Sequence, residues 1–109
     1  MTTMTFTIHD LEQRVRQRAT AGPDVSYTRK LLDKGIAHCA KKLGEEAVET
    51  VVAATAEDRD RVISETADLI YHLLVVLNAR DVTLAEVEAV LAARTQMSGI
   101  DEKAARKGG

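Results

Sequence analysis

Residues 42–79, KLGEEAVETVVAATAEDRDRVISETADLIYHLLVVLNA, carry two groups of acidic residues inside two largely apolar segments. The first group has the spacing E-E-x-x-E, and the second, E-x-x-D, follows after fifteen residues. Steps of three and four residues return to the same face of an α-helix. At about 100° per residue, each group falls on one side of its own helix. The stretch therefore predicts two neighbouring helices that each present carboxylates.

The two groups are Glu45, Glu46 and Glu49, then Glu65 and Asp68. Five carboxylates on neighbouring helices repel one another unless a cation lies between them. Hard divalent cations prefer oxygen ligands, so the pattern indicates a magnesium site that manganese could also fill. The alternative is a solvated acidic face, which is the usual state of Glu-rich helices. The apolar surroundings argue against it, because burying uncompensated carboxylates is very costly.

Helical periodicity predicts five segments, at about 8–20, 26–35, 36–56, 58–79 and from 84 onward. Thr7 with Asp10, and Thr83 with Glu86, have the spacing of residues that cap helix starts. Each long segment has an apolar stripe that we expect to pack. The stripes are Ile8, Leu11 and Val15; Ile36, Ala40, Leu43, Ala47, Val51 and Ala54; Val62, Thr66, Leu69, Ile70, Leu73 and Leu77; and Leu84, Val87, Val90 and Leu91.

The expected fold is all-α, a bundle of about five antiparallel helices joined by short turns. Residues 1–97 would form one helical domain, and 98–109 a polar, mobile tail. Of 109 residues only one Phe and two Tyr are aromatic, so small aliphatic side chains must form the core. A small core in a short helical chain often needs a partner subunit, and we expect a homodimer.

Composition excludes several classes of protein. The formal net charge of −2 gives no basic footprint for nucleic acid. No run of about 18 apolar residues is evident, so no membrane span or membrane association is expected. No secretory signal is expected either, and the single Cys39 fits a reducing cytoplasm. Cys39 is better explained as a small core residue than as a nucleophile, because no thiolate-stabilising motif surrounds it.

Magnesium bound by carboxylates keeps positions open for water and for substrate phosphates. The sequence has no P-loop, no H-E-x-x-H motif and no glycine-rich dinucleotide fingerprint. These absences argue against kinase, zinc-protease and Rossmann-type chemistry. The acidic groups therefore predict metal-assisted hydrolysis of a phosphoanhydride.

The paired acidic motifs resemble those of the all-α nucleoside-triphosphate pyrophosphatase superfamily, the MazG-like proteins. Together with the S-Y-T segment at 26–28 and the run A-D-L-I-Y-H-L-L at 67–74, they resemble the phosphoribosyl-ATP pyrophosphatase family of histidine biosynthesis. The resemblance covers about residues 6–95. It implies hydrolysis of phosphoribosyl-ATP to phosphoribosyl-AMP and pyrophosphate.

By the same resemblance, Glu45, Glu46, Glu49 and Asp68 would bind magnesium. Glu65 would be a further ligand or would position the attacking water, and Glu45 and Glu65 would be the catalytic carboxylates. The sequence leaves this division of roles open.

Four residues are candidates for binding substrate: Lys42, His72, Arg29 and Lys30. Lys42 precedes the acids by one turn, where it could meet a phosphate or remain a surface lysine. His72 could contact phosphate, orient a carboxylate, or be a packed neutral histidine. Arg29, Lys30 and Lys34 give the second helix a basic edge that either steers phosphates or is simply solvated.

Two points and two alternative functions stay open. Tyr27 could stack on adenine or lie in the core. Gly44 could permit the close approach of a helix or ligand, or could be a tolerated glycine. The same acids would serve a house-cleaning pyrophosphatase acting on non-standard or deoxynucleoside triphosphates. A non-catalytic helical module that dimerises and binds a protein partner is the alternative outside the enzymes.

Overall fold

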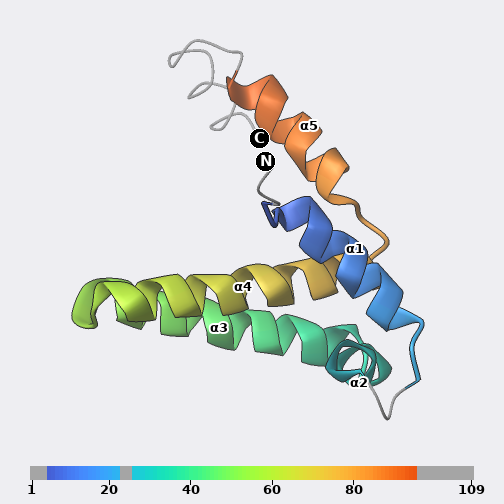
Figure 1. Cartoon of the computed structure of the whole chain (residues 1–109), viewed down its shortest axis with the longest axis horizontal. Helices are drawn as coiled ribbons and strands as arrows, with labels where there is room; N and C mark the ends of the chain where they lie inside the picture. Colours follow the sequence, from blue (N-terminus) through green and yellow to red (C-terminus); the bar gives the residue numbers. More distant parts are fainter. Residues whose placement is uncertain (1–4, 23–25, 96–109) are drawn as a thin grey trace.

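The computed structural model describes residues 5–22 and 26–95, and this part of the chain contains five helices and no strand. The helices are α1 (Ile8–Ala19), α2 (Tyr27–Asp33), α3 (Ile36–Ala56), α4 (Arg59–Ala79) and α5 (Leu84–Thr95), shown in Figure 1. The all-α prediction is confirmed, with helix ends within one or two residues of those expected. The tail predicted at 98–109 lies outside the described residues.

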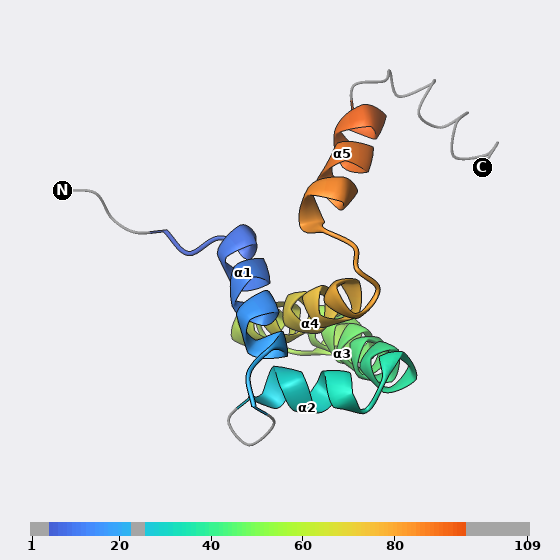
Figure 2. The same ribbon diagram turned by 90° about the vertical axis from the view of Figure 1, so that its right-hand side faces the viewer.

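The two longest helices, α3 and α4, lie side by side and antiparallel as a hairpin (Figure 1). The short α2 lies against one end of this hairpin. α1 and α5 leave the hairpin near that same end and diverge from each other, as Figure 2 shows. α4 contacts α1, α2 and α3, so it is the central helix, as the breadth of its apolar surface suggested.

Local side-chain caps explain where the helices begin. Thr7 and Asp10 form a capping box at α1, with Thr7 N donating to Asp10 Oδ2 at 2.9 Å. Thr83 and Glu86 exchange the same pair of bonds at the start of α5. Ser26 Oγ accepts a hydrogen bond from a backbone amide of α2. Such caps satisfy amides that have no partner inside the helix, so short polar residues determine the helix starts.

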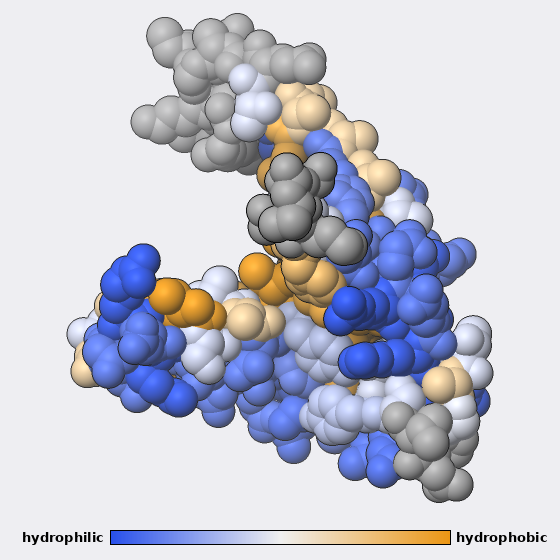
Figure 3. Space-filling model, in the orientation of Figure 1, coloured by the Kyte–Doolittle hydropathy of each residue, from blue (hydrophilic) through white to orange (hydrophobic). Residues whose placement is uncertain are grey.

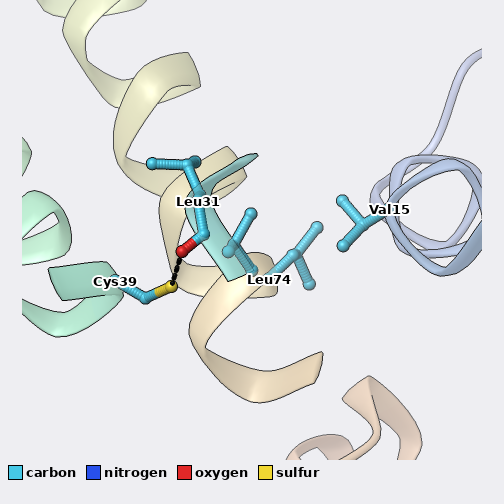
Figure 4. Packing of buried hydrophobic residues seen from close by; sticks show 5 residues of the cluster. Val15, Leu31, Cys39 and Leu74 are labelled. Carbon is cyan, nitrogen blue, oxygen red and sulfur yellow. Dashed lines mark hydrogen bonds between the residues drawn. The ribbon is translucent and has the colours of Figure 1, made fainter. Parts of the chain in front are cut away.

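The apolar core lies where α1, α2 and α3 meet the second half of α4 (Figure 4). It consists of Val15, Leu31, Cys39, Leu74 and Val75. The thiol of Cys39 donates to the carbonyl oxygen of Leu31 at 3.2 Å, and burial raises the pKa of this thiol. Cys39 is therefore a core residue and not an activated nucleophile, which confirms the preferred interpretation.

The expected apolar stripes of α3 and α5 are wrong in large part. On α3 the side chains of Ile36, Ala40, Val51 and Ala54 are exposed, whereas the buried residues are Cys39 and Ala53. On α5 no residue is buried, and Val90 and Leu91 are half exposed. Apolar surface is visible on α5 and where the hairpin meets α1 and α5 (Figure 3). Apolar residues occupy much of the circumference of α3, so periodicity alone did not identify the side facing α4.

α4 is long and apolar enough, by length and composition alone, to cross a membrane, although Glu65 and Asp68 interrupt its apolar sequence. Core helices of soluble proteins pass the same test. α4 packs against three other helices and buries Glu65 and His72 along its length. Ionisable groups are costly within lipid, so these features favour a packed helix.

Candidate active site

Three acidic side chains converge across the hairpin. Glu46 and Glu49 come from α3 and Glu65 from α4, and one carboxylate oxygen of each lies within 4.8 Å of the others. The steps of three residues on α3 place its two glutamates on the side that faces α4. The predicted meeting of the two acidic motifs is therefore present in the structure.

Two of these carboxylates have oxygens that are buried and have no hydrogen-bond partner, namely Glu46 Oε2 and Glu65 Oε2. A buried polar atom without a partner costs roughly 1–3 kcal/mol, more when it is charged. A hard divalent cation would satisfy both oxygens, and carboxylate oxygens are the ligands that magnesium and manganese prefer. The residues present therefore fit a divalent cation at this point.

Glu65 is the most strongly perturbed acid of the cluster. Only 5% of it is exposed, and burial, followed by the neighbouring Glu49, raises the pKa of its carboxyl. Arg61, one turn earlier on α4, acts in the opposite direction because its Nη2 donates to Glu65 Oε1. Arg61 thus supplies positive charge at the cluster.

The Thr50 side chain links α3 to α4 beside the acidic cluster. Its hydroxyl lies 2.8 Å from the carbonyl oxygen of Glu46, one turn earlier on α3, and 3.2 Å from that of Glu65 on α4. The Thr50 hydroxyl reaches a carbonyl oxygen on each helix, so the backbones of α3 and α4 lie close together at this level. Thr50 therefore helps to determine how closely the two acidic motifs approach.

His72 lies between the acidic cluster and two tyrosine rings. It is 6% exposed, and its ring meets Tyr71 edge-on at 5.0 Å and Tyr27 at 6.4 Å. Its Nε2 is 4.0 Å from Glu46 Oε1, and burial lowers the pKa of the imidazole. This position suits a packed, neutral histidine that touches the Glu46 carboxylate but is too far from it to hydrogen-bond, and its buried Nδ1 has no partner among the described residues.

The remaining two predicted metal ligands lie outside the group of converging oxygens. Glu45 is exposed, and its Oε1 forms an ion pair with Lys42 Nζ at 3.3 Å. That contact raises the pKa of the Lys42 ammonium group. Asp68 is exposed one turn after Glu65, and its negative charge contributes to the raised pKa of Glu65. Asp68 is therefore at the border of the cluster, and Glu45 faces the lysine.

A cavity of about 460 Å³ opens between α2 and the first half of α3. It is lined by Tyr27, Lys30, Leu31, Asp33, Lys34, His38 and Lys42. Of the substrate-binding candidates, Lys30 and Lys42 therefore line a cavity, and His72 is buried. Arg29 does not line it, because its guanidinium bonds to Asp33 Oδ1 at 2.8 Å and to the carbonyl oxygen of Ala19 at 3.1 Å.

Tyr27 and Gly44 are both exposed in the structure. Tyr27 is 56% exposed and lines the cavity, and its ring stacks on Tyr71 with 6.4 Å between centroids. It is therefore not a core residue. Gly44 has open space around the position that a Cβ would occupy. Within this chain, then, Gly44 does not serve the close packing of another helix.

Comparison with known proteins identifies the family. A family model described as phosphoribosyl-ATP pyrophosphohydrolase matches residues 8–95. The chain belongs to this family. A relative from Bradyrhizobium diazoefficiens, named phosphoribosyl-ATP pyrophosphatase 1, is 64% identical over 102 residues, which are 94% of this chain and 96% of the relative.

Two further relatives of the phosphoribosyl-ATP pyrophosphohydrolase family carry the name phosphoribosyl-ATP pyrophosphatase. The protein from Nitrobacter winogradskyi is 64% identical over 101 residues, 93% of this chain and 87% of the relative. That from Rhizobium meliloti is 55% identical over 102 residues, 94% and 95% of the two chains. The family resemblance predicted from the acidic motifs and the S-Y-T segment is confirmed.

Three residues at the candidate site of this pyrophosphohydrolase family member were missed by the sequence reasoning. Arg61 stands four residues before Glu65, a spacing that could have signalled the ion pair. Thr50 stands four residues after Glu46, but its bond across to α4 has no signal in one sequence. His38 stands four residues before Lys42, yet only the packing of α2 shows that the two line one cavity.

Proposed function

We propose that this chain hydrolyses phosphoribosyl-ATP to phosphoribosyl-AMP and pyrophosphate in a magnesium-dependent reaction, a step of histidine biosynthesis. The observation that carries the proposal is the convergence of Glu46, Glu49 and Glu65 in a chain of this family. The water oxygen forms a new bond to phosphorus, and the bridging bond between the α and β phosphates breaks. The water proton goes to a carboxylate of the protein.

Glu46, Glu49 and Glu65 would bind the cation, and the exposed Asp68, one turn after Glu65, would be a further ligand. When bound, magnesium neutralises phosphate charge and polarises the anhydride, and manganese can substitute for it. The paired helices fix the carboxylates before substrate arrives, so little reorganisation is needed during the reaction.

Glu65 is the carboxylate we assign to the water. It is buried, and its Oε2 has no hydrogen-bond partner among the described residues, which suits an oxygen that must accept a proton from a water held at the cluster. Glu45, the other catalytic candidate, is paired with Lys42, so a role in keeping that lysine beside the substrate suits it better. Lys42 then contacts the triphosphate as a point charge.

His72 packs beside Glu46 and limits the positions that its carboxylate can take. Its Nε2 lies 4.0 Å from that carboxylate, and the tyrosine rings fix the orientation of the imidazole. Residues that orient metal ligands commonly change activity by 10- to 100-fold when they are replaced. His72 is therefore a positioning residue in this proposal.

The experiment is a substrate panel. The purified chain is incubated with magnesium and either phosphoribosyl-ATP, ATP or deoxynucleoside triphosphates, and release of pyrophosphate is followed. We expect phosphoribosyl-ATP to have the highest kcat/KM. Preference for a plain triphosphate would support the house-cleaning alternative, and release from none of them by a folded chain would reject the enzyme assignment.

The exposed apolar side chains on α3 support the expected homodimer. Val48, Val51 and Val52 are 63%, 61% and 48% exposed, and a second copy would bury them. We assign the dimer to the cytoplasm, without a nucleic-acid or membrane partner, because the single Cys39 is a buried free thiol. Light scattering after size exclusion tests the dimer, with Val51→Asp expected to give the monomer mass.

A further inference from the structure

The cavity between α2 and α3 is built from two pairs of basic side chains. Lys30 lies on α2, and Lys34, four residues later, is the C-cap of that helix, whereas His38 and Lys42 stand four residues apart on α3. Gly35, with φ of 95°, makes the turn that folds the two helices toward each other. A side chain would strain that conformation, so the glycine allows the two pairs to line one cavity.

The positive charge of Lys30 and Lys34 is not balanced by an ion pair within the described part of the chain. Asp33 is the only acidic residue of the lining, and it is already bonded to Arg29 at 2.8 Å. Among the described residues no carboxylate pairs with Lys30 or Lys34, whereas Lys42 pairs with Glu45. Like charges one helical turn apart repel each other, and a bound anion would relieve that repulsion.

The basic cavity lies near the acidic cluster. Tyr27, in the cavity lining, has its ring 6.4 Å from that of His72, and His72 Nε2 lies 4.0 Å from Oε1 of the metal-ligand candidate Glu46. One ligand could therefore extend from the acids into the cavity. Phosphoribosyl-ATP has phosphates at two separate places, a triphosphate that reacts and a phosphate monoester on its second ribose that does not. A plain nucleoside triphosphate has only the first.

We propose that Lys30 and Lys34, with His38 opposite them, bind the unreactive phosphate monoester of the substrate and so select phosphoribosyl-ATP over plain nucleoside triphosphates. This assignment of roles rests on the proposed function for its choice of substrate. The exposed ring of Tyr27 forms a wall of the same cavity against which the ribose lies. The cavity volume of about 460 Å³ falls within the 300–1,000 Å³ typical of small-molecule sites.

A binding experiment tests the subsite without turnover. Amide and imidazole NMR signals of the full chain are followed during titration with ribose 5-phosphate and, separately, with ribose. We expect saturable shifts at residues 27–42 with ribose 5-phosphate and none with ribose. The double variant Lys30→Gln/Lys34→Gln should lose them, and Lys41→Gln, an exposed lysine of α3 outside the lining, should retain them. Equal responses to both ligands, or shifts that persist in the double variant, would overturn the subsite.

Kinetics then test the role in specificity. A charged hydrogen bond is worth roughly a factor of 10 to 100 in affinity, so the double variant should raise KM for phosphoribosyl-ATP by at least about tenfold. Its kcat, and the inhibition constant of ATP as a competitor, should change by less than about threefold. If the inhibition constant of ATP rises as much as KM, the lysines bind the triphosphate and the proposal is wrong.

The two experiments also separate this inference from the proposed function. If ribose 5-phosphate binds in the cavity but the parent chain does not hydrolyse phosphoribosyl-ATP, the anion subsite stands and the substrate assignment falls. If the parent hydrolyses phosphoribosyl-ATP and the double variant has an unchanged KM, the reaction stands and the subsite falls.

Discussion

The two halves of α4 contact their neighbours through different kinds of side chain: the second half through apolar residues, and the first half through a buried carboxylate. Near α1 and α2, apolar side chains such as Leu74 and Val75 are buried against Val15 and Leu31. In the first half of α4, the buried residue is Glu65, which faces carboxylates of α3. Burial of apolar surface stabilises the fold directly, at about 25 cal/mol per Å².

Burial of carboxylates has the opposite effect. Desolvation and mutual repulsion disfavour the charged cluster until a cation binds. α4 therefore serves two tasks: its apolar half stabilises the fold, and its acidic half lowers stability but contributes to a preformed cation site. Substitutions at the two ends should therefore change different properties.

The largest effect is expected in the apolar core. Leu74→Ala should reduce the free energy of unfolding by about 2–5 kcal/mol, because it removes buried methyl groups and leaves a cavity. Denaturant unfolding measures this change. Leu74→Met, which conserves volume, should cost less than about 1.5 kcal/mol. Below the unfolding transition, kcat of Leu74→Ala should stay within a few-fold of the parent. A loss of activity as large as that expected for Glu46→Gln would show that the apolar and acidic halves of α4 do not have separate roles.

At the acidic end the pattern should reverse. Glu46→Gln should lower kcat/KM by about 10²- to 10³-fold, because it removes a ligand of the cation that stabilises transition-state charge. Its melting temperature without metal should equal or exceed that of the parent, since repulsion is relieved. Asp60→Asn, on the exposed first turn of α4, is the matched control and should retain activity. Unchanged turnover in Glu46→Gln would instead favour a non-catalytic module.

A smaller effect is expected at Arg61, whose guanidinium contacts Glu65. A cation that binds Glu65 must compete with this ion pair. The Arg61 side chain is half exposed, and exposed pairs are worth about 0.2–1 kcal/mol, so Arg61→Gln should tighten magnesium binding by a factor of about 1.4 to 5. Calorimetric titration checks this, and weaker binding would show that Arg61 supports the site instead of competing for it.

The pH dependence of stability gives the most subtle test. The pKa of Glu65 is raised on folding, so the folded state holds this proton more tightly than the unfolded chain. Stability gained from protonation is therefore present at low pH and lost as pH rises through the folded pKa. In EDTA, the melting temperature of the parent relative to Glu65→Gln should fall as pH rises above 4.5, the ordinary pKa of a glutamate carboxyl. A difference that does not vary with pH would refute the assignment.

The sequence predicted the helices well because their starts depend on short-range chemistry. Thr7, Ser26 and Thr83 each bond to backbone within their own first turn, and such signals are visible in one sequence. The acidic motifs were also predictable, since helix geometry alone puts Glu46 and Glu49 on one side.

Contacts between helices were less predictable. The periodicity of α3 identified many apolar residues, but Val51 faces outward, and Thr50 occupies the side that meets α4. The cavity at Lys30 and His38 likewise depends on how α2 folds back on α3. These contacts between helices depend on how the whole chain packs, and helical periodicity in a single sequence does not specify that packing.

The most direct measurement is thermal unfolding of the metal-free chain during titration with magnesium and, in parallel, manganese. A cation that binds only the folded state adds about 2.7 kcal/mol of stability at a concentration of one hundred times Kd. We predict a saturable rise in melting temperature for the parent and for Asp60→Asn, and its loss in Glu46→Gln and Glu65→Gln. A flat response of the parent to both metals, or an equal rise in the acid variants, would contradict a cation site between α3 and α4.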